Sequence, residues 1–258
     1  MTDVVVNGVR HHVQRLGAGD RTVVFVHGLV MDNLSSFYFT LANPIAANAE
    51  VILYDLRGHG LSERPSAGYA IADLVADLAA LLDTLAIERP VELVGNSFGG
   101  LIALAFAAAH PARVASLALI DAHDGTEGWA AQMTDTLALR GDARDSKIGS
   151  SFQSWLGRHS ERKRTRLARA AEALVEGTSL IDDLRRSPTM TTSALASIAC
   201  PTLALYGELS DVRDRGEQLA KTLPACTLQI LPGCTHSVLW EATAEVRERV
   251  TAFVKRPR

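Results

Sequence analysis

The chain has 258 residues, of which 47% are hydrophobic and 21% are charged, and its formal net charge is −3. This composition supports one large α/β core and excludes nucleic-acid binding driven by charge alone. No uncharged apolar run approaches the roughly 20 residues of a membrane-spanning helix, and no secretory signal is visible. The three cysteines are odd in number, which favours reduced thiols. We therefore expect a cytoplasmic protein that binds neither membrane nor nucleic acid.

The first predicted element is a β-hairpin, because residues 4–6 and 9–16 flank Asn7-Gly8, a dipeptide typical of two-residue hairpin turns. Apolar strand patterns then alternate with helical ones along the chain. The predicted strands are 21–26, 51–54, 91–94, 116–120, 203–206 and 227–231, and the predicted helices are 35–47, 71–85, 100–110, 213–223 and 238–254. This alternation predicts an α/β fold with a mostly parallel sheet covered by helices on both faces.

Residues 122–198 interrupt the alternation, because they are rich in charged and small polar residues and contain no buried-strand pattern. Helical stretches are predicted near 129–140, 147–157, 160–176 and 178–186. We interpret residues 122–198 as a helical lid inserted into a core formed by 1–121 and 199–258, placed where open α/β sheets bind ligands. The alternative is a surface decoration with no role in binding.

The stretch from Gly95 to Gly99 contains Ser97 between two glycines, after an apolar strand and before an alanine-rich helix. A serine hydroxyl needs exposure on a sharp turn and a neighbouring base to act as a nucleophile. Glycines at both flanks let the surrounding backbone approach such a turn closely. The pattern therefore predicts a strand–nucleophile–helix elbow, and Ser97 is the candidate nucleophile.

Four segments carry a resemblance to a known family: HGLVMD (27–32), YDLRGHGLSERP (54–65), GNSFGG (95–100) and PGCTHSVLWE (232–241). They follow the family's order of oxyanion loop, strand-four turn, nucleophile and histidine. The chain resembles the α/β-hydrolase superfamily over nearly its whole length, as a small cytoplasmic esterase- or lactonase-like member with a helical lid. The resemblance implies an α/β-hydrolase fold and a Ser–Asp–His triad.

For that triad, the resemblance implies Ser97 as nucleophile and His236 as general base. Asp211 follows the strand 203–206 in the family's usual position for the acid, although the most frequent spacing falls on Ser210. Asp121, at the end of the strand 116–120, is the alternative acid, because some relatives carry it there. We rank Asp211 ahead of Asp121.

The resemblance also implies that the backbone N–H groups of Leu29 and Phe98 form the oxyanion hole. His27 is interpreted as a residue that organises its loop, and His59 as a turn residue. A serine triad needs no cofactor, and we expect neither a cofactor nor a metal. Serine at position 97 disfavours epoxide and halide chemistry, which relatives perform with a carboxylate nucleophile.

The substrate pocket is predicted from apolar side chains beside the nucleophile and in the lid, namely Val30, Trp129, Met133, Phe152 and Trp155. The lid also carries a basic run of Arg158, Arg162, Lys163, Arg164, Arg166 and Arg169. We interpret this run as a solvated helix face. The alternative is a docking patch for an acyl-carrier protein or for the phosphates of a coenzyme A thioester.

These features predict a serine hydrolase that cleaves a carboxylic ester or lactone of a small molecule through an acyl-enzyme on Ser97. The alternatives are a thioesterase, a lyase or cyclase acting on a carrier-bound or biosynthetic acyl intermediate, and a small-molecule receptor with slow turnover. Product mass separates the lyase from the hydrolase, and the rate of turnover separates the receptor from both.

Overall fold

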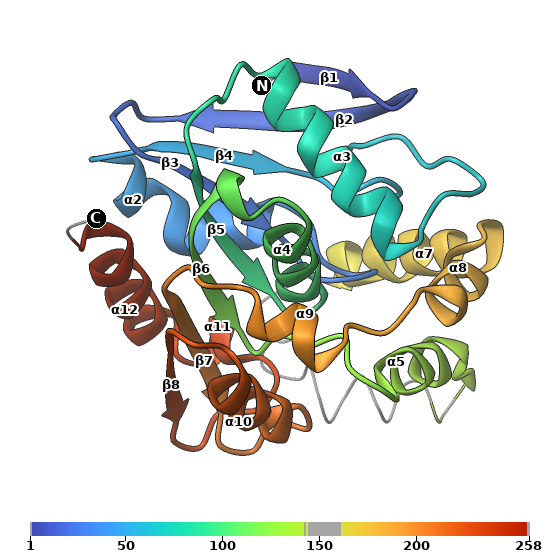
Figure 1. Ribbon diagram of the computed structural model, residues 1–258. Coiled ribbons are helices and arrows are strands. Elements are labelled where there is room, and N and C mark those ends of the chain that lie inside the picture. Colours follow the sequence, from blue (N-terminus) through green and yellow to red (C-terminus); the bar gives the residue numbers. More distant parts are fainter. Residues whose placement is uncertain (1, 142, 144–160, 257–258) are drawn as a thin grey trace.

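The computed structural model describes residues 2–141, 143 and 161–256, and its centre is an eight-stranded sheet (Figure 1). The strand order is β1-β2-β4-β3-β5-β6-β7-β8. The strands are β1 (Thr2–Val6), β2 (Val9–Leu16), β3 (Thr22–Val26), β4 (Glu50–Tyr54), β5 (Val91–Asn96), β6 (Val114–Ile120), β7 (Thr202–Gly207) and β8 (Cys226–Leu231). Each lies within a few residues of its predicted position.

The sheet is mostly parallel, as predicted. Only the β1–β2 hairpin and the β2–β4 pair are antiparallel among these strands, and every other neighbouring pair is parallel. Val23 and Phe25 of β3 pack into one hydrophobic cluster, and Val24 and Val26 pack into another. This strict alternation shows that the central strands are buried on both faces, because successive side chains of a strand point to opposite sides.

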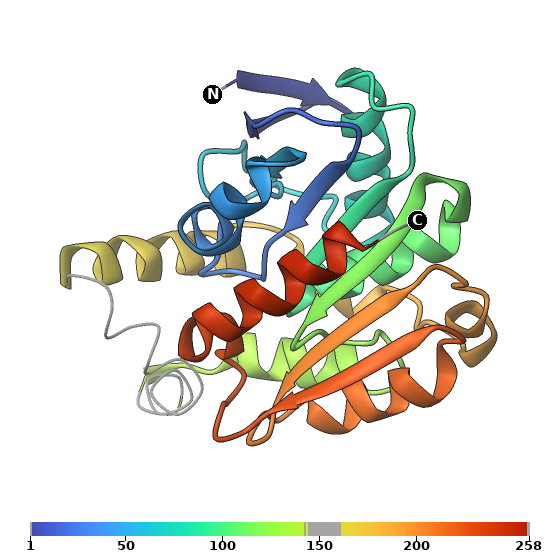
Figure 2. The same cartoon turned by 90° about the vertical axis from the view of Figure 1, so that its left-hand side faces the viewer.

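Helices cover both faces of the sheet (Figure 2). One face is covered by α3, α4, α9 and α10, and the other by α1, η1, α2, α11 and α12. Their bounds are α1 (Ser35–Phe37), η1 (Tyr38–Ala42), α2 (Asn43–Ala46), α3 (Ile71–Thr84), α4 (Phe98–Ala109), η2 (Pro111–Arg113), α9 (Thr192–Ala196), α10 (Arg213–Thr222), α11 (Val238–Glu241) and α12 (Thr243–Lys255).

Two predicted helices are divided in the structure. The helix predicted over 35–47 consists of α1, a π-helical turn at η1 and α2. The helix predicted over 238–254 is broken at Ala242, whose φ of −119° and ψ of 39° leave the helical region. Helix α9 was not predicted; it is a single turn, capped by the Thr191 hydroxyl, which accepts the Ala194 N–H at 3.1 Å.

The helices α5 (Trp129–Ala138), α7 (Glu161–Gly177), α8 (Leu180–Arg186) and α9 lie between β6 and β7 in the chain, and we call them the helical insertion. The first three correspond to predicted helices, whereas the helix predicted over 147–157 lies outside the described residues. The division into a core and a lid stays a prediction. What the structure adds is that α5 and α7 share a cavity with the ends of the central strands.

Candidate active site

The turn between β5 and α4 presents Ser97 in a strained backbone conformation, with φ of 53° and ψ of −117°. A Cβ on Gly99 would lie 2.0 Å from the Val26 carbonyl oxygen, and one on Gly95 would lie 2.6 Å from the Gly100 backbone. Only glycine fits both positions, because any side chain would collide with fixed backbone. The predicted elbow is confirmed, and the flanking glycines are required by close approach.

Three side chains form a continuous hydrogen-bonded relay. Ser97 Oγ lies 2.9 Å from Nε2 of His236, which stands on the loop after β8. His236 Nδ1 lies 2.6 Å from Oδ2 of Asp121, the first residue after β6. Asp121 is fully buried. An imidazole held in this way has Nδ1 as the donor toward the carboxylate and Nε2 free to accept the serine proton.

Asp121, and not the higher-ranked Asp211, makes this hydrogen bond to His236. Asp211 Oδ1 is 3.9 Å from His236 Nδ1, and the Asp211 side chain is 45% exposed. Asp121 adopts a left-handed φ of 46°, and its Oδ1 accepts the Gly207 N–H at 2.8 Å. The Ser210 hydroxyl donates to Oδ2 of the same carboxylate. Ser210 therefore occupies the position after β7 where the family most often carries the acid. Its side chain points inward, and its hydroxyl donates a hydrogen bond to the carboxylate of Asp121 after β6.

The amides of Leu29 and Phe98 are available as oxyanion donors. Within the described part of the chain, neither N–H donates a hydrogen bond to a protein group. Phe98 is the first residue of α4, so its N–H also lies at the positive end of the helix dipole. These are the donors that the sequence predicts, and their catalytic role stays a prediction.

Side chains on both sides of Leu29 hold its loop in place. The Gly28 N–H donates to Oδ2 of Asp32 at 2.7 Å, and the Val30 N–H donates to Nε2 of His59 at 2.8 Å. Val30 has a left-handed φ of 66°, which is costly for a β-branched residue. The two hydrogen bonds fix the peptides that flank Leu29 and so fix the direction of its N–H.

His59 is therefore more than a turn residue. Its ring is buried, and its Nδ1 donates to the Arg57 carbonyl at 2.9 Å, which leaves Nε2 as the acceptor for Val30. Burial, with the adjacent His27 ring, lowers the pKa of His59 to about 3, so the acceptor stays unprotonated at neutral pH. His27 Nε2 accepts the Leu56 N–H at 3.0 Å and so links the loop after β3 to the loop after β4.

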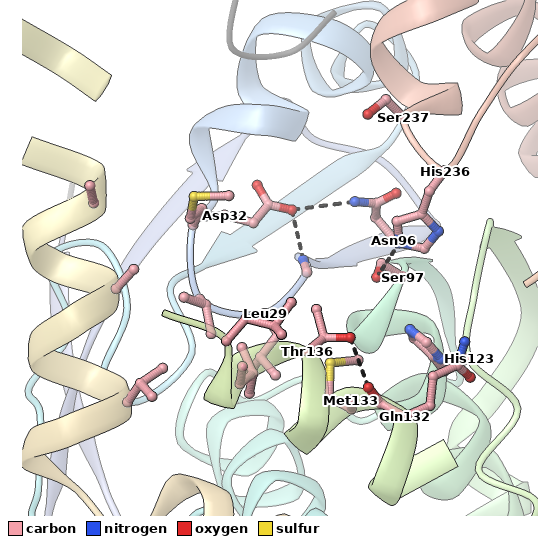
Figure 3. A pocket seen from close by; sticks show the side chains of 18 of the residues that line it. Leu29, Asp32, Asn96, Ser97, His123, Gln132, Met133, Thr136, His236 and Ser237 are labelled. Atoms are coloured by element: carbon pink, nitrogen blue, oxygen red, sulfur yellow. Dashed lines mark hydrogen bonds between the residues drawn. The ribbon is translucent and has the colours of Figure 1, made fainter. Parts of the chain in front are cut away.

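A cavity of about 280 Å³ opens above Ser97 (Figure 3). Its lining combines the end of β5, the loops after β3, β6, β7 and β8, and the helices α5, α7 and α11. The lining residues are Gly28, Leu29, Val30, Met31, Asp32, Asn96, Ser97, His123, Gln132, Met133, Thr136, Leu137, Leu139, Arg140, Ala168, Ala171, Glu172, Val175, Glu176, Asp211, His236, Ser237, Leu239 and Trp240. The volume lies at the lower end of small-molecule sites.

The predicted pocket residues divide into three groups. Val30 and Met133 line the cavity. Trp129 does not line the cavity. It is buried behind Phe98, with 6.5 Å between the two ring centroids. Phe152 and Trp155 lie outside the described residues.

Two polar groups at the cavity were not predicted. Asn96 precedes the nucleophile and donates from its side chain to Oδ2 of Asp32 at 3.3 Å. His123 is buried, its ring centroid lies 5.9 Å from that of His236, and its backbone N–H donates to the Ser97 carbonyl at 3.3 Å. Burial, His236 and Arg215 lower the pKa of His123 to about 3. His123 lies two residues after Asp121 in the sequence. A first rank for Asp121 as the acid would therefore also have indicated that His123 lies near the site.

Of the predicted basic run, Arg162, Arg164, Arg166 and Arg169 are exposed on α7. Arg158 lies outside the described residues, and the Lys163 side chain is not described. Among the residues that the structure describes, no group of three or more His, Cys, Asp or Glu side chains could hold a metal ion. The same residues include no helix that is both long and apolar enough to cross a membrane.

Comparison with known proteins agrees with this fold. A family model for the alpha/beta hydrolase fold matches residues 21–243. The chain is 37% identical over 136 residues to a 2-hydroxy-6-oxo-2,4-heptadienoate hydrolase of Pseudomonas putida, a match that covers 52% of this chain and 47% of that protein. It is 36% identical over 137 residues to a 2-hydroxymuconate semialdehyde hydrolase of a Pseudomonas species, with 52% and 46% covered. The matches thus span about half the length of these relatives.

Solved structures resemble the whole chain. Est816, described as an N-acyl homoserine lactone degrading enzyme, superposes with a TM-score of 0.76 at 25% identity over 98% of this chain and 100% of its own. The enol-lactonase of Burkholderia xenovorans LB400 superposes with a TM-score of 0.79 at 23% identity, over 99% and 100%. At 23% identity the second likeness concerns the fold alone.

Proposed function

This chain belongs to the α/β-hydrolase family, and from that premise we propose that it is a serine hydrolase that cleaves an ester or lactone of a small molecule. The observation that carries the proposal is the relay in which Ser97, His236 and Asp121 are joined by hydrogen bonds of 2.9 and 2.6 Å. It lies at the base of a cavity large enough for a small acyl substrate.

In the first step, Ser97 Oγ attacks the carbonyl carbon while His236 Nε2 takes the hydroxyl proton. Asp121 stabilises the imidazolium and holds its tautomer. The tetrahedral intermediate collapses as His236 returns the proton to the leaving alcohol oxygen, leaving an acyl ester on Ser97. A water molecule then attacks this ester with His236 as base, and the acid is released with Ser97 restored.

Negative charge on the carbonyl oxygen meets the N–H groups of Leu29 and Phe98, which donate to no other described protein group. Such donors accelerate the reaction because they are oriented before charge develops. In this proposal Asp32 and His59 act as positioning residues, since they hold the Gly28 and Val30 amides on either side of Leu29.

Support for a lactone or ester, rather than another acyl compound, comes from Est816, whose description names lactone degradation and which is 25% identical over nearly the full chain. A second candidate is the chemistry named for the Pseudomonas relatives, which are hydrolases of a heptadienoate and of a semialdehyde. Their higher identity over half the chain favours it. The thioesterase, lyase or cyclase, and receptor alternatives remain hypotheses, and an acyl-carrier or coenzyme A partner belongs to the first of them.

The test is hydrolysis of p-nitrophenyl esters of increasing chain length, beside a lactone series followed by proton release. We expect turnover that peaks at one chain length and falls at least about a thousandfold in Ser97→Ala. Full activity in Ser97→Ala would exclude the serine mechanism. If no ester or lactone is turned over although a serine-reactive phosphonate labels Ser97, the substrate belongs to one of the other classes.

A further inference from the structure

The charged side chains that line the cavity are mostly acidic. Among the described lining residues, four are carboxylates, Asp32, Glu172, Glu176 and Asp211, whereas one is a cation, Arg140. Arg140 pairs with Glu176, at 3.2 Å between Nη2 and Oε1, and its guanidinium also donates to the carbonyls of Leu137 and Leu139 at 3.0 Å. An anionic substrate would therefore compete with a carboxylate for that cation.

Asp32 brings one of these negative charges to the catalytic end of the cavity (Figure 3). Its Oδ2 accepts the Gly28 N–H at 2.7 Å and the Asn96 side-chain amide at 3.3 Å. Its Oδ1 accepts the Asn33 N–H at 2.9 Å and the Ser36 hydroxyl. These donors are all uncharged and so supply no countercharge to the carboxylate. Asp32 thus sits between the residue before the nucleophile and the residue before Leu29.

The wall formed by α5 and α7 is mostly apolar, with Gln132 and Thr136 as polar residues on α5. Helix α5 contributes Met133 and Leu137, and α7 contributes Ala168, Ala171 and Val175. Glu172 lies in this same stretch of α7 and faces the cavity with them. A carboxylate on the acyl chain would lose hydration against the apolar side chains and meet negative charge at both ends of the cavity.

We infer that the cavity selects uncharged acyl groups and rejects substrates that carry a carboxylate on the acyl chain, with Asp32 as the main determinant and Glu172 as the second. The inference rests on the proposed function and names the substrate class of that site. Two unit charges about 8 Å apart, at an effective dielectric constant of about 20, repel enough to change an equilibrium constant roughly thirtyfold. After screening by salt, we expect a discrimination of about tenfold or more.

The test compares three p-nitrophenyl esters of matched length: the pentanoate, the mono-ester of glutarate, and the methyl ester of that glutarate. The glutarate replaces the terminal methyl of the pentanoate with a carboxylate, and its methyl ester restores neutrality while keeping the oxygens. The rate measured with Ser97→Ala is subtracted, because glutarate mono-esters also hydrolyse spontaneously. We expect kcat/KM for the anionic ester to be at least about tenfold below that of both neutral esters.

Asp32→Asn and Glu172→Gln should each reduce the difference in kcat/KM between the neutral and the anionic esters, and Asp32→Asn should reduce it more. Raised salt should reduce the same difference in the unmodified protein. Asp135→Asn is the matched control, because Asp135 lies on α5, its side chain is 77% exposed and it does not line the cavity. Equal or faster hydrolysis of the anionic ester would overturn the inference. A preference for the neutral esters that stays unchanged in both Asp32→Asn and Glu172→Gln would also overturn it.

Labelling of Ser97 separates this inference from the proposed function. A neutral alkyl fluorophosphonate and its ω-carboxylate analogue should label Ser97 at rates that differ in the same direction and by a similar factor. If labelling shows the difference but no ester is turned over, the charge selection stands and ester hydrolysis fails. If esters are turned over without discrimination, the charge selection fails. If Ser97 is neither labelled nor needed for turnover, both are overturned.

Discussion

The helix that follows the nucleophile and the helix that forms the far wall of the cavity differ sharply in how they are held. Helix α4 buries nine of its twelve residues beneath the sheet. In α7, which has 17 residues, Leu174 is the one buried side chain among those described. The reacting groups are thus set on the rigid core, whereas the substrate-facing wall is set on an exposed surface.

This difference separates two kinds of change. Substitutions at the ends of the core strands should alter the chemical step, because they move groups fixed by the sheet backbone. Substitutions on the walls should alter which acyl groups bind while the chemistry persists. The kinetic experiments below test the two sides of this separation, and an unfolding experiment tests the buried core, beginning with the largest expected effect.

Asp121→Asn should lower kcat by about a thousandfold or more, because an amide that donates to Nδ1 stabilises the wrong histidine tautomer. Asp211→Asn should lower kcat less than tenfold, because its carboxylate is 3.9 Å from the same nitrogen and its side chain is 45% exposed. Steady-state kinetics on one ester decide between them. An equal loss in both variants, or a larger one at position 211, would assign the acid to the loop after β7.

His59→Leu should lower kcat by about a hundredfold with little change in KM, because Val30 loses its acceptor and the adjacent Leu29 N–H loses its direction. His59→Gln keeps an acceptor oxygen at a similar reach and should recover much of the loss. Thermal unfolding of both variants checks that they fold. A uniform rise in KM in both, or equal kcat in the two, would contradict a positioning role.

The buried histidines predict how stability depends on pH. For His123, the pKa falls from 6.5 to about 3 on folding, so below pH 6.5 the unfolded chain binds a proton that the folded chain does not. The free energy of unfolding should therefore fall by about 1.4 kcal/mol per pH unit for this group as the pH drops from 6.5 toward 3.

Replacing His123 with Gln should remove this group's contribution to the dependence of the unfolding free energy on pH. Urea unfolding at pH 7, 6 and 5 measures it, with His110→Gln, at the end of α4, as the matched control. If His123→Gln and the unmodified protein keep the same slope, His123 is not the neutral buried group described here.

Met133→Ala and Val175→Ala should shift the preferred acyl chain length upward while changing kcat for the shortest ester only two- to threefold. Both residues line the cavity from the helical insertion, on α5 and α7, whereas the relay residues stand at the ends of the core strands. The readout is the chain-length profile of kcat/KM. A collapse of turnover on all esters would show that the wall also controls the chemical step.

The sequence predicted the sheet and the sharp turn that carries Ser97 because their signals are local. Buried parallel strands appear as apolar runs, and the glycines that flank Ser97 form a short pattern in the sequence, although Gly99 is required by its approach to the Val26 carbonyl of β3. The choice between Asp121 and Asp211 could not be made in this way. Both follow adjacent parallel strands, and the outcome depends on the left-handed turn at Asp121 and on Ser210 facing inward.

The positioning roles of Asp32 and His59 were not predicted either. His59 accepts a hydrogen bond from Val30, which is far from it in the sequence, and Asp32 holds Gly28 within a loop whose conformation depends on tertiary contacts. The pocket was predicted least well. Trp129 is a large apolar side chain, of the kind expected to line a substrate pocket, but it packs behind Phe98. The small side chains of Ala168 and Ala171 line the cavity. An exposed helix with a narrow apolar stripe gives no signal of which side faces a ligand.

The central claim is that an acyl group passes through Ser97, and rapid-quench mass spectrometry during turnover of the preferred p-nitrophenyl ester tests it most directly. The account predicts that the peptide containing Ser97 gains the mass of the acyl group within the first turnover, and that the gain is absent in Ser97→Ala. Turnover at the full rate without any acylated Ser97 peptide would contradict it, because the ester would then be hydrolysed by direct attack of water.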